Sequence, residues 1–298
     1  MSLLTEADDL PHRPSERSDW RESYYFNFVD LESGISGFTT IGLLPNLKRR
    51  EFVFVLFYDG KREAHFMEPE GPFPPDSDKA LSNGHLEYGI VEPLKEWRIR
   101  FSGDNIGADL TWKGRFPAYC FSGCSKTSWS DHFEQSGVVT GMVDLPGGRK
   151  VEINGLGQRD KSWGPRDWHI EGWYALHAQF KSLSIGLRRD IINGSPVVSG
   201  GVSKAEGHVA VDKVDLETTF MEGTKIPTGS LTRIFSADGK VYTLKSSLIT
   251  PTSFVKFARP FANGSTELFE EMAVHECQEL VERATGLIEW LFTYPKNP

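Results

Sequence analysis

Short runs of apolar and β-branched residues recur along the chain, separated by turns rich in glycine and proline. In several runs apolar and polar residues alternate, which is the period of a β-strand with one buried face. Residues 48–58 (KRREFVFVLFY) are a dense example, and they end at Asp59-Gly60, a dipeptide typical of a tight hairpin turn. Residues 138–144 and 150–153 flank a Pro-Gly-Gly turn and predict a second hairpin. No long stretch keeps a helical period, so the pattern predicts an all-β protein.

The expected strands follow one another at steady spacing. They cover residues 20–29, 48–58, 86–91, 97–101, 109–114, 138–144, 150–153, 168–180, 183–188, 197–202, 213–219, 231–235, 241–248 and 253–257. The last segment, 267–294, is mixed, because 268–283 has helical spacing whereas Gly286 and 287–292 favour a closing strand. The first 19 residues are polar and predict a loose arm.

The length of the chain sets the number of domains. A barrel of about eight to ten strands needs about 130–160 residues, so 298 residues accommodate two. The turn-rich stretch 155–165 is the expected seam. We therefore predict two antiparallel β-barrel domains packed together, one at residues 1–155 and one at 156–298.

Net charge and cysteine content indicate which partners, cellular location and metal binding to expect. A net charge of −8 and a pI near 5.6 argue against a nucleic-acid partner, because binding phosphates needs a basic face. No apolar window is long enough to span a bilayer, and the N-terminus lacks a secretory signal. Three cysteines cannot all pair, which favours a reduced, cytoplasmic location. Cys120 and Cys124 lack a second pair at zinc-like spacing, so we predict no metal site.

One segment combines charge, aromatic rings and turn residues. Residues 155–168 contain the pairs Arg159-Asp160 and Arg166-Asp167 within a framework of glycines, a proline and two tryptophans. Charges placed beside tryptophans at such a corner are expected to be partly buried and therefore paired. Two interpretations stay open: a structural Arg–Asp lattice that pins the barrels together, and a polar cluster at the mouth of an apolar cavity.

The strand predicted at 168–180 presents two different faces. Alternation places Trp168 and Tyr174 on an apolar face. His169, Glu171 and His177 share the opposite face, with the first two about 7 Å apart along the strand. That separation suits an acid–base pair or two metal ligands, although a solvated face is the simpler interpretation. His132 and Glu134 also share a face, and for them an exposed strand edge is the simpler interpretation.

The central motif resembles a known superfamily. Residues 157–168 (GQRDKSWGPRDW), with 132–137 (HFEQSG) and Gly141, resemble the double-lipocalin superfamily of carotenoid 1,2-hydratases and kievitone hydratase, and especially a bacterial branch with an RDHSWG.RDW signature. Residues 20–26 and 92–98 resemble the same branch, so the resemblance spans nearly the whole chain. Lys161 stands where the signature has histidine. The resemblance implies two lipocalin-like barrels, a hydrophobic ligand and no cofactor.

These observations favour a hydro-lyase. Protonating an alkene needs an acid held in a dry pocket, and aromatic faces stabilise the resulting cation. We predict a hydratase or dehydratase that acts on an alkene, or on a tertiary or allylic alcohol, of a terpenoid-like lipophilic molecule. Asp160 and Asp167 are the predicted acid–base pair, with Arg159 and Arg166 holding one of them ionised. The other predicted site residues are the aromatic wall Trp163, Trp168 and Tyr174, the ligand contact Glu171, and the proton relays His169 and His177.

Two other functions remain open. The chain could be a non-catalytic carrier of a hydrophobic ligand, because lipocalin barrels bind such ligands and a fold does not fix a function. A pericyclase or isomerase would need the aromatic walls but no carboxylate that activates water. The expected partner is in each case a lipophilic small molecule, and a homodimer is left open.

Overall fold

The computed structural model describes residues 4–74, 76–121, 131–166, 168 and 170–295. The chain divides into two compact units, unit 1 ending at Arg166 and unit 2 containing the described residues from Trp168 onward. The predicted boundary at residue 155 lies inside β10 (Arg149–Pro165), which pairs along its length with strands of unit 1. A strand hydrogen-bonded on both sides cannot be cut without breaking the sheet, so the seam follows its last residue.

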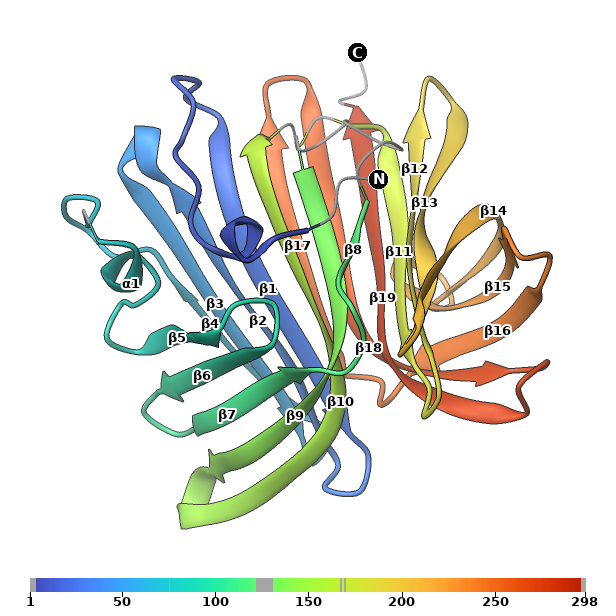
Figure 1. The fold of residues 1–298 in the computed structure, drawn as a ribbon, viewed down its shortest axis with the longest axis horizontal. Helices are drawn as coiled ribbons and strands as arrows, with labels where there is room; N and C mark the ends of the chain where they lie inside the picture. Colours follow the sequence, from blue (N-terminus) through green and yellow to red (C-terminus); the bar gives the residue numbers. More distant parts are fainter. Residues whose placement is uncertain (1–3, 75, 122–130, 167, 169, 296–298) are drawn as a thin grey trace. The chain divides into compact units, whose positions relative to one another are not determined.

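Unit 1 is a curled antiparallel sheet (Figure 1) with the strand order β4-β3-β2-β1-β10-β9-β7-β6-β5, and β8 pairs with β9. Its elements before β10 are η1 (Glu6–Asp9), β1 (Trp20–Asp30), β2 (Ile35–Leu44), η2 (Pro45–Leu47), β3 (Arg49–Tyr58), β4 (Lys61–Met67), α1 (Ser77–Ala80), β5 (Leu86–Glu92), β6 (Glu96–Ser102), β7 (Gly107–Gly114), β8 (Tyr119–Cys120), β9 (Asp131–Leu145) and η3 (Pro146–Gly148). Both predicted hairpins are present, as β3–β4 and β9–β10. Asp59 and Gly60 have φ values of 50° and 70°, as the tight turn requires.

Unit 2 is an antiparallel sheet of nine strands, eight of which close into a barrel. Its strands are β11 (Gly172–Gln179), β12 (Ser184–Ile192), β13 (Ser195–Lys204), β14 (Gly207–Phe220), β15 (Pro227–Ser236), β16 (Val241–Leu248), β17 (Phe254–Phe261), β18 (Gly264–Cys277) and β19 (Glu282–Pro295). They follow one another in the order β16-β15-β14-β13-β12-β11-β19-β18, pairing of β16 with β18 closes the ring, and β17 adds to β18. The predicted all-β fold with two lipocalin-like barrel domains is thus confirmed, unit 1 being the more open.

The helix considered for 268–283 is wrong, because β18 and β19 form a long hairpin there. Every second residue of β18, from Phe269 through Glu271 and Ala273 to His275, is fully or almost fully buried. Alternate positions that are all buried but chemically mixed do not stand out as a two-residue period in the sequence.

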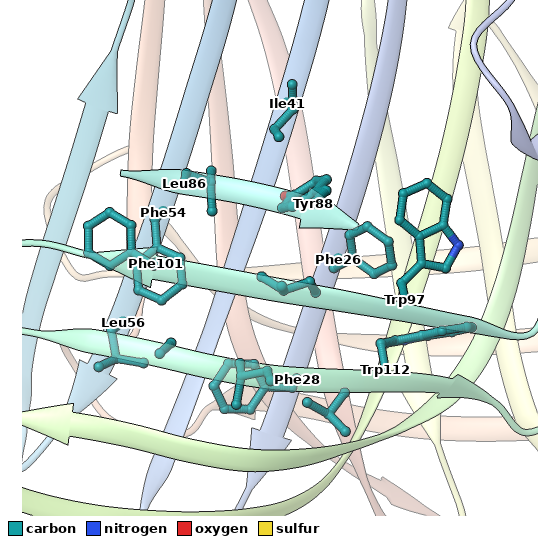
Figure 2. Packing of buried hydrophobic residues seen from close by; sticks show 14 of the residues in the cluster. Phe26, Phe28, Ile41, Phe54, Leu56, Leu86, Tyr88, Trp97, Phe101 and Trp112 are labelled. Atoms are coloured by element: carbon teal, nitrogen blue, oxygen red, sulfur yellow. The ribbon is translucent and has the colours of Figure 1, made fainter. Parts of the chain in front are cut away.

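Aromatic side chains fill the concave side of unit 1. Figure 2 shows Phe26 beside Tyr88 and Trp97, and the ring centroids lie 5.2 and 5.5 Å apart. Phe54 and Phe101 stack with centroids 4.1 Å apart. Burying one such side chain stabilises a fold by about 1.5–3 kcal/mol, so these rings are a main source of stability. The interior of unit 1 is a packed core.

Gly137 tests how tightly this core is packed. A Cβ at Gly137 would lie 2.2 Å from the indole of Trp112, which is fully buried. We expect Gly137→Ala to lower the free energy of unfolding by about 1–3 kcal/mol, the usual cost of overpacking a core. A Cβ at Gly89, on β5, would meet nothing closer than 4.0 Å, so Gly89→Ala should change stability by less than about 0.5 kcal/mol. Urea denaturation of both variants measures the difference, and equal midpoints would contradict the packing argument.

Candidate functional site

Strand β10 divides the central motif between two faces of the unit 1 sheet. Arg159 lies opposite Phe26 and Gln135, and Lys161 opposite Tyr24 and Phe133, on the concave side that holds the aromatic core. Asp160 projects from the other side, because consecutive residues of a strand alternate. The two side chains therefore leave the strand in opposite directions, although the charge of Asp160 still opposes the lowering of the Arg159 pKa by burial. The role of Arg159 in holding Asp160 ionised stays a prediction.

The two basic residues instead bind the N-terminal arm. Arg159 donates to Asp9 at 2.6 Å, and both side chains are buried. Lys161 Nζ lies 2.9 Å from a carboxylate oxygen of Glu22 and donates to the carbonyl of Asp8, also at 2.9 Å. Burial lowers the pKa of Lys161, and Glu22 opposes that shift. The expected loose arm is thus wrong for residues 8–9, which are fastened to unit 1 by buried charges.

On the other face, Asp160 belongs to a group of polar side chains that we call the carboxylate cluster. It consists of Tyr119, His132, Glu134, Gln158 and Asp160. The backbone register places Asp160 directly opposite Glu134 on the neighbouring strand β9. His132 Nε2 lies 3.7 Å from Glu134 Oε1 and 4.0 Å from Asp160 Oδ1. One imidazole nitrogen is thus within ion-pair distance of two carboxylates.

Hydrogen bonds orient Glu134 within the carboxylate cluster. Its Oε2 accepts from the Tyr119 hydroxyl at 2.9 Å and from Gln158 Nε2 at 2.5 Å. Burial, reinforced by the nearby Glu134 charge, raises the pKa of Tyr119 well above its ordinary value, so the hydroxyl keeps its proton and stays a donor. The side chains of Glu134 and His132 are buried, whereas the side chain of Asp160 is 25% exposed to solvent. Asp160 is the carboxylate of the cluster that a ligand can reach.

Two other aromatic rings, those of Phe121 and Tyr119, lie near His132. The ring of Phe121 stacks on the imidazole with centroids 4.6 Å apart, and Tyr119 lies 5.3 Å from Phe121. The expected exposed edge at His132 and Glu134 is wrong, because this part of β9 lies between β10 on one side and β8 on the other. The alternation of residues 132–136 was the available signal, and it could not say whether the polar face would be covered.

The other predicted residues at the end of unit 1 have structural contacts. Trp163 stacks on His12 with ring centroids 4.0 Å apart. The backbone amide of Arg166 donates to the Asp19 carbonyl at 2.9 Å. Asp167 and His169 lie outside the described residues, so the structure does not test their roles.

The residues predicted in unit 2 are spread over different environments. Strand β11 begins only at Gly172, so the predicted alternation does not extend back to Trp168. The rings of Trp168 and Trp173 have centroids 6.2 Å apart, and Tyr174 belongs to a different hydrophobic cluster. Glu171 accepts a hydrogen bond from the Gly194 amide at 3.0 Å, which fixes the β12–β13 turn. His177 is buried on the face of β11 opposite Tyr174. The roles assigned to these residues stay predictions.

Tyr174 lies inside the barrel of unit 2, close to a carboxyl group that the sequence did not single out. Its hydroxyl lies 3.0 Å from both Ser230 Oγ and Thr232 Oγ1, and burial raises its pKa to about 12. Glu271 is fully buried, and neither of its carboxyl oxygens has a hydrogen-bond partner among the described residues. Burial raises the pKa of Glu271 to about 9. This side chain is therefore a neutral acid at pH 7.

Glu271 predicts a pH dependence of stability. Folded protein keeps this proton up to about pH 9, whereas an unfolded glutamate loses it near pH 4.5. Between these values the folded state binds more protons, so the free energy of unfolding falls as pH rises, by up to about 1.4 kcal/mol per pH unit. Glu271→Gln should flatten the curve between pH 7 and 8.5, a range above the titration of His275, whose pKa burial lowers to about 3.

Urea denaturation across that pH range measures the effect. Glu276→Gln, on the same strand but exposed, should leave the slope of the wild-type curve unchanged. Parallel curves for the wild type and Glu271→Gln would contradict a protonated Glu271.

Comparison with known proteins places the chain in a family. The sequence model described as "Domain of unknown function (DUF7064)" matches residues 5–293. This chain belongs to the DUF7064 family. No curated protein matches its sequence. Within the part of the DUF7064 chain that the structure describes, no helix is long and apolar enough to cross a membrane, and no three His, Cys, Asp or Glu side chains are grouped so as to hold a metal ion.

Two solved structures share the fold of this DUF7064 protein. Kievitone hydratase from Nectria haematococca superposes with a TM-score of 0.67 at 12% identity, covering 97% of this chain and 93% of that one. A protein described as an AttH from Nitrosomonas europaea also gives a TM-score of 0.67 at 12% identity, covering 95% and 98%. The predicted likeness to kievitone hydratase is confirmed for the fold.

Proposed function

We propose that this DUF7064 protein is a hydratase or dehydratase, acting on an alkene or on a tertiary or allylic alcohol of a lipophilic, terpenoid-like small molecule. The observation that carries the proposal is the position of His132 Nε2 between the carboxylates of Glu134 and Asp160. The shared fold with kievitone hydratase supports the same class of reaction.

In the hydration direction, the protonated carboxyl of Asp160 gives its proton to one alkene carbon. The π electrons form the new C–H bond and leave a cation on the other carbon, which the faces of Phe121 and Tyr119 stabilise by about 0.5–2 kcal/mol each. A water oxygen then bonds to the cation, and Glu134 accepts the proton that the water loses. His132 passes this proton from Glu134 to Asp160, which restores the acid.

Dehydration is the same sequence in reverse. Protonated Glu134 gives its proton to the hydroxyl group, water leaves, and the Asp160 carboxylate removes a proton from the neighbouring carbon. His132 then returns that proton from Asp160 to Glu134. No net charge is gained or lost in either direction, so a cluster that holds one transferable proton is sufficient.

Isotope incorporation from solvent tests the class of reaction. The protein is incubated with geraniol, linalool and lycopene in H₂¹⁸O, and the products are analysed by mass spectrometry. We expect an alcohol carrying one ¹⁸O from an alkene probe, or a triene formed from linalool by loss of water. An isomerised product without ¹⁸O would favour the isomerase alternative, and binding without turnover would favour the carrier; either result would overturn the proposal.

A further inference from the structure

Two neighbouring strands in the closed barrel of unit 2 are hydrogen-bonded over only a short stretch. β13 and β14 pair only from Gly201↔Ala210 to Lys204↔Gly207. Beyond these pairs, β13 stays bonded to β12 and β14 to β15, so each presents an unpaired edge to the other. A bulge in β14 between Val211 and Lys213 accompanies the separation. A cavity of about 470 Å³ occupies this region, within the range of about 300–1,000 Å³ typical of small-molecule sites.

Part of the cavity wall is apolar. Val198 from β13 and Val214 and Leu216 from β14 line it, and Val214 belongs to the barrel core. Leu231 on β15 also lines it and is 40% exposed, a large apolar side chain left in contact with solvent. A ligand with a hydrocarbon body would cover this surface.

One cationic side chain in the cavity wall has a nitrogen with no hydrogen-bond partner among the described residues. Arg189 lies directly opposite Val198 in the β12–β13 register and lines the cavity. Its Nε is buried and has no hydrogen-bond acceptor among the residues that the structure describes. Buried N–H groups are nearly always hydrogen-bonded, and a guanidinium edge matches the two oxygens of a carboxylate.

The remaining charges limit the charge of the ligand. Asp212, Asp215 and Glu217 line the β14 side of the cavity, and Lys213 is already bound to Asp215 at 2.9 Å. Arg233 on β15 also lines the cavity and lies opposite Asp215 in the β14–β15 register. These carboxylates would repel a multiply charged anion such as a phosphate, whereas a single negative charge can be placed against Arg189. The site therefore favours a monoanion with an apolar tail.

We propose that the cavity between β13 and β14 is a binding site for a lipophilic monocarboxylic acid, with the carboxylate on Arg189 and the hydrocarbon chain against Val198, Val214 and Leu216. This site lies within unit 2 and uses none of the residues of the carboxylate cluster. It goes beyond the proposed hydratase activity and does not depend on it.

Isothermal titration of the full chain with decanoate, decanol and decyl phosphate tests the proposal. We expect wild type to bind decanoate at least tenfold more tightly than the other two ligands. Arg189→Met should weaken decanoate at least tenfold, so that the acid and the alcohol bind alike. Val198→Trp, which fills the cavity, should weaken decanoate and decanol alike. Arg283→Gln, an exposed change on β19 away from the cavity, is the matched control and should bind as wild type does.

Several results would overturn the proposal. They are the absence of decanoate binding to wild type, unchanged binding in Arg189→Met or Val198→Trp, and a preference for decyl phosphate. Asp160→Asn separates the two sites, because it should bind decanoate as wild type does even if the hydratase proposal fails. Loss of decanoate binding in Asp160→Asn would place the ligand elsewhere and refute the unit 2 site. Thermal melts of each variant confirm that it is folded.

Discussion

Asp160→Asn should lower the turnover of the hydratase or dehydratase reaction by at least about 100-fold, the usual contribution of a general acid, while its melting temperature stays close to that of wild type. Asp160 is the more exposed carboxylate of the cluster and lies within 4.0 Å of His132 Nε2. An amide cannot donate the proton that forms the new C–H bond. Its size and shape are nearly those of the acid, so the sheet should fold normally. The measurement is product formation from the probe that wild type converts.

Further variants distinguish a catalytic role of Asp160 from a structural role. Asp144→Asn, on the exposed end of β9 where Asp144 pairs with Lys150, should retain full turnover. His132→Gln should also slow the reaction and alter its pH profile, because glutamine cannot relay a proton. Wild-type turnover in Asp160→Asn would remove Asp160 from the mechanism. A large loss of stability in the same variant would instead favour the structural interpretation of this residue.

Arg159→Met should lower the free energy of unfolding by about 3–5 kcal/mol, the usual cost of leaving a buried charge without its partner. Asp9 is fully buried and accepts hydrogen bonds from Arg159, from Trp97 Nε1 at 3.1 Å and from the Leu94 amide at 2.5 Å. Without the guanidinium, its carboxylate would remain in the aromatic core of unit 1. Urea denaturation followed by tryptophan fluorescence measures the loss.

A double-mutant cycle shows whether the pair is the cause. Asp9→Leu with Arg159→Met removes both charges, and it should lose less stability than the sum of the two single variants. Arg149→Met is the control, because its ion pair with Asp59 is half-exposed and should contribute less than about 1 kcal/mol. Strictly additive losses in the cycle would contradict a coupling between Asp9 and Arg159.

Local pattern predicted much of the fold. The hairpin at Asp59-Gly60 and the hairpin around Pro146 follow from turn residues that set backbone angles without help from the rest of the chain. The alternation of apolar and polar residues did not predict strand β18, because its buried positions include the polar residues Glu271 and His275. It also extended the strand that begins at Gly172 back to Trp168, because tryptophan and isoleucine are residues typical of strands.

The candidate site was predicted only in part. The sequence singled out Asp160 but paired it with its neighbour Arg159, which lies on the opposite face of β10. Its described neighbours in the cluster, His132 and Glu134, come from β9, more than 20 residues earlier in the chain. Their spacing predicted a shared face, but the predicted hairpin stopped at residues 138 and 153 and so did not reach the pairing of Glu134 with Asp160.

The sequence by itself determined that the chain is built from strands, where several of them turn, and that charge and tryptophan gather near residue 160. The tertiary structure alone decided that Arg159 binds Asp9 and that β16 meets β18 to close the barrel. The physical reason is that alternation along a strand depends on neighbouring bonds, whereas the partner of a side chain depends on the register between segments far apart in sequence.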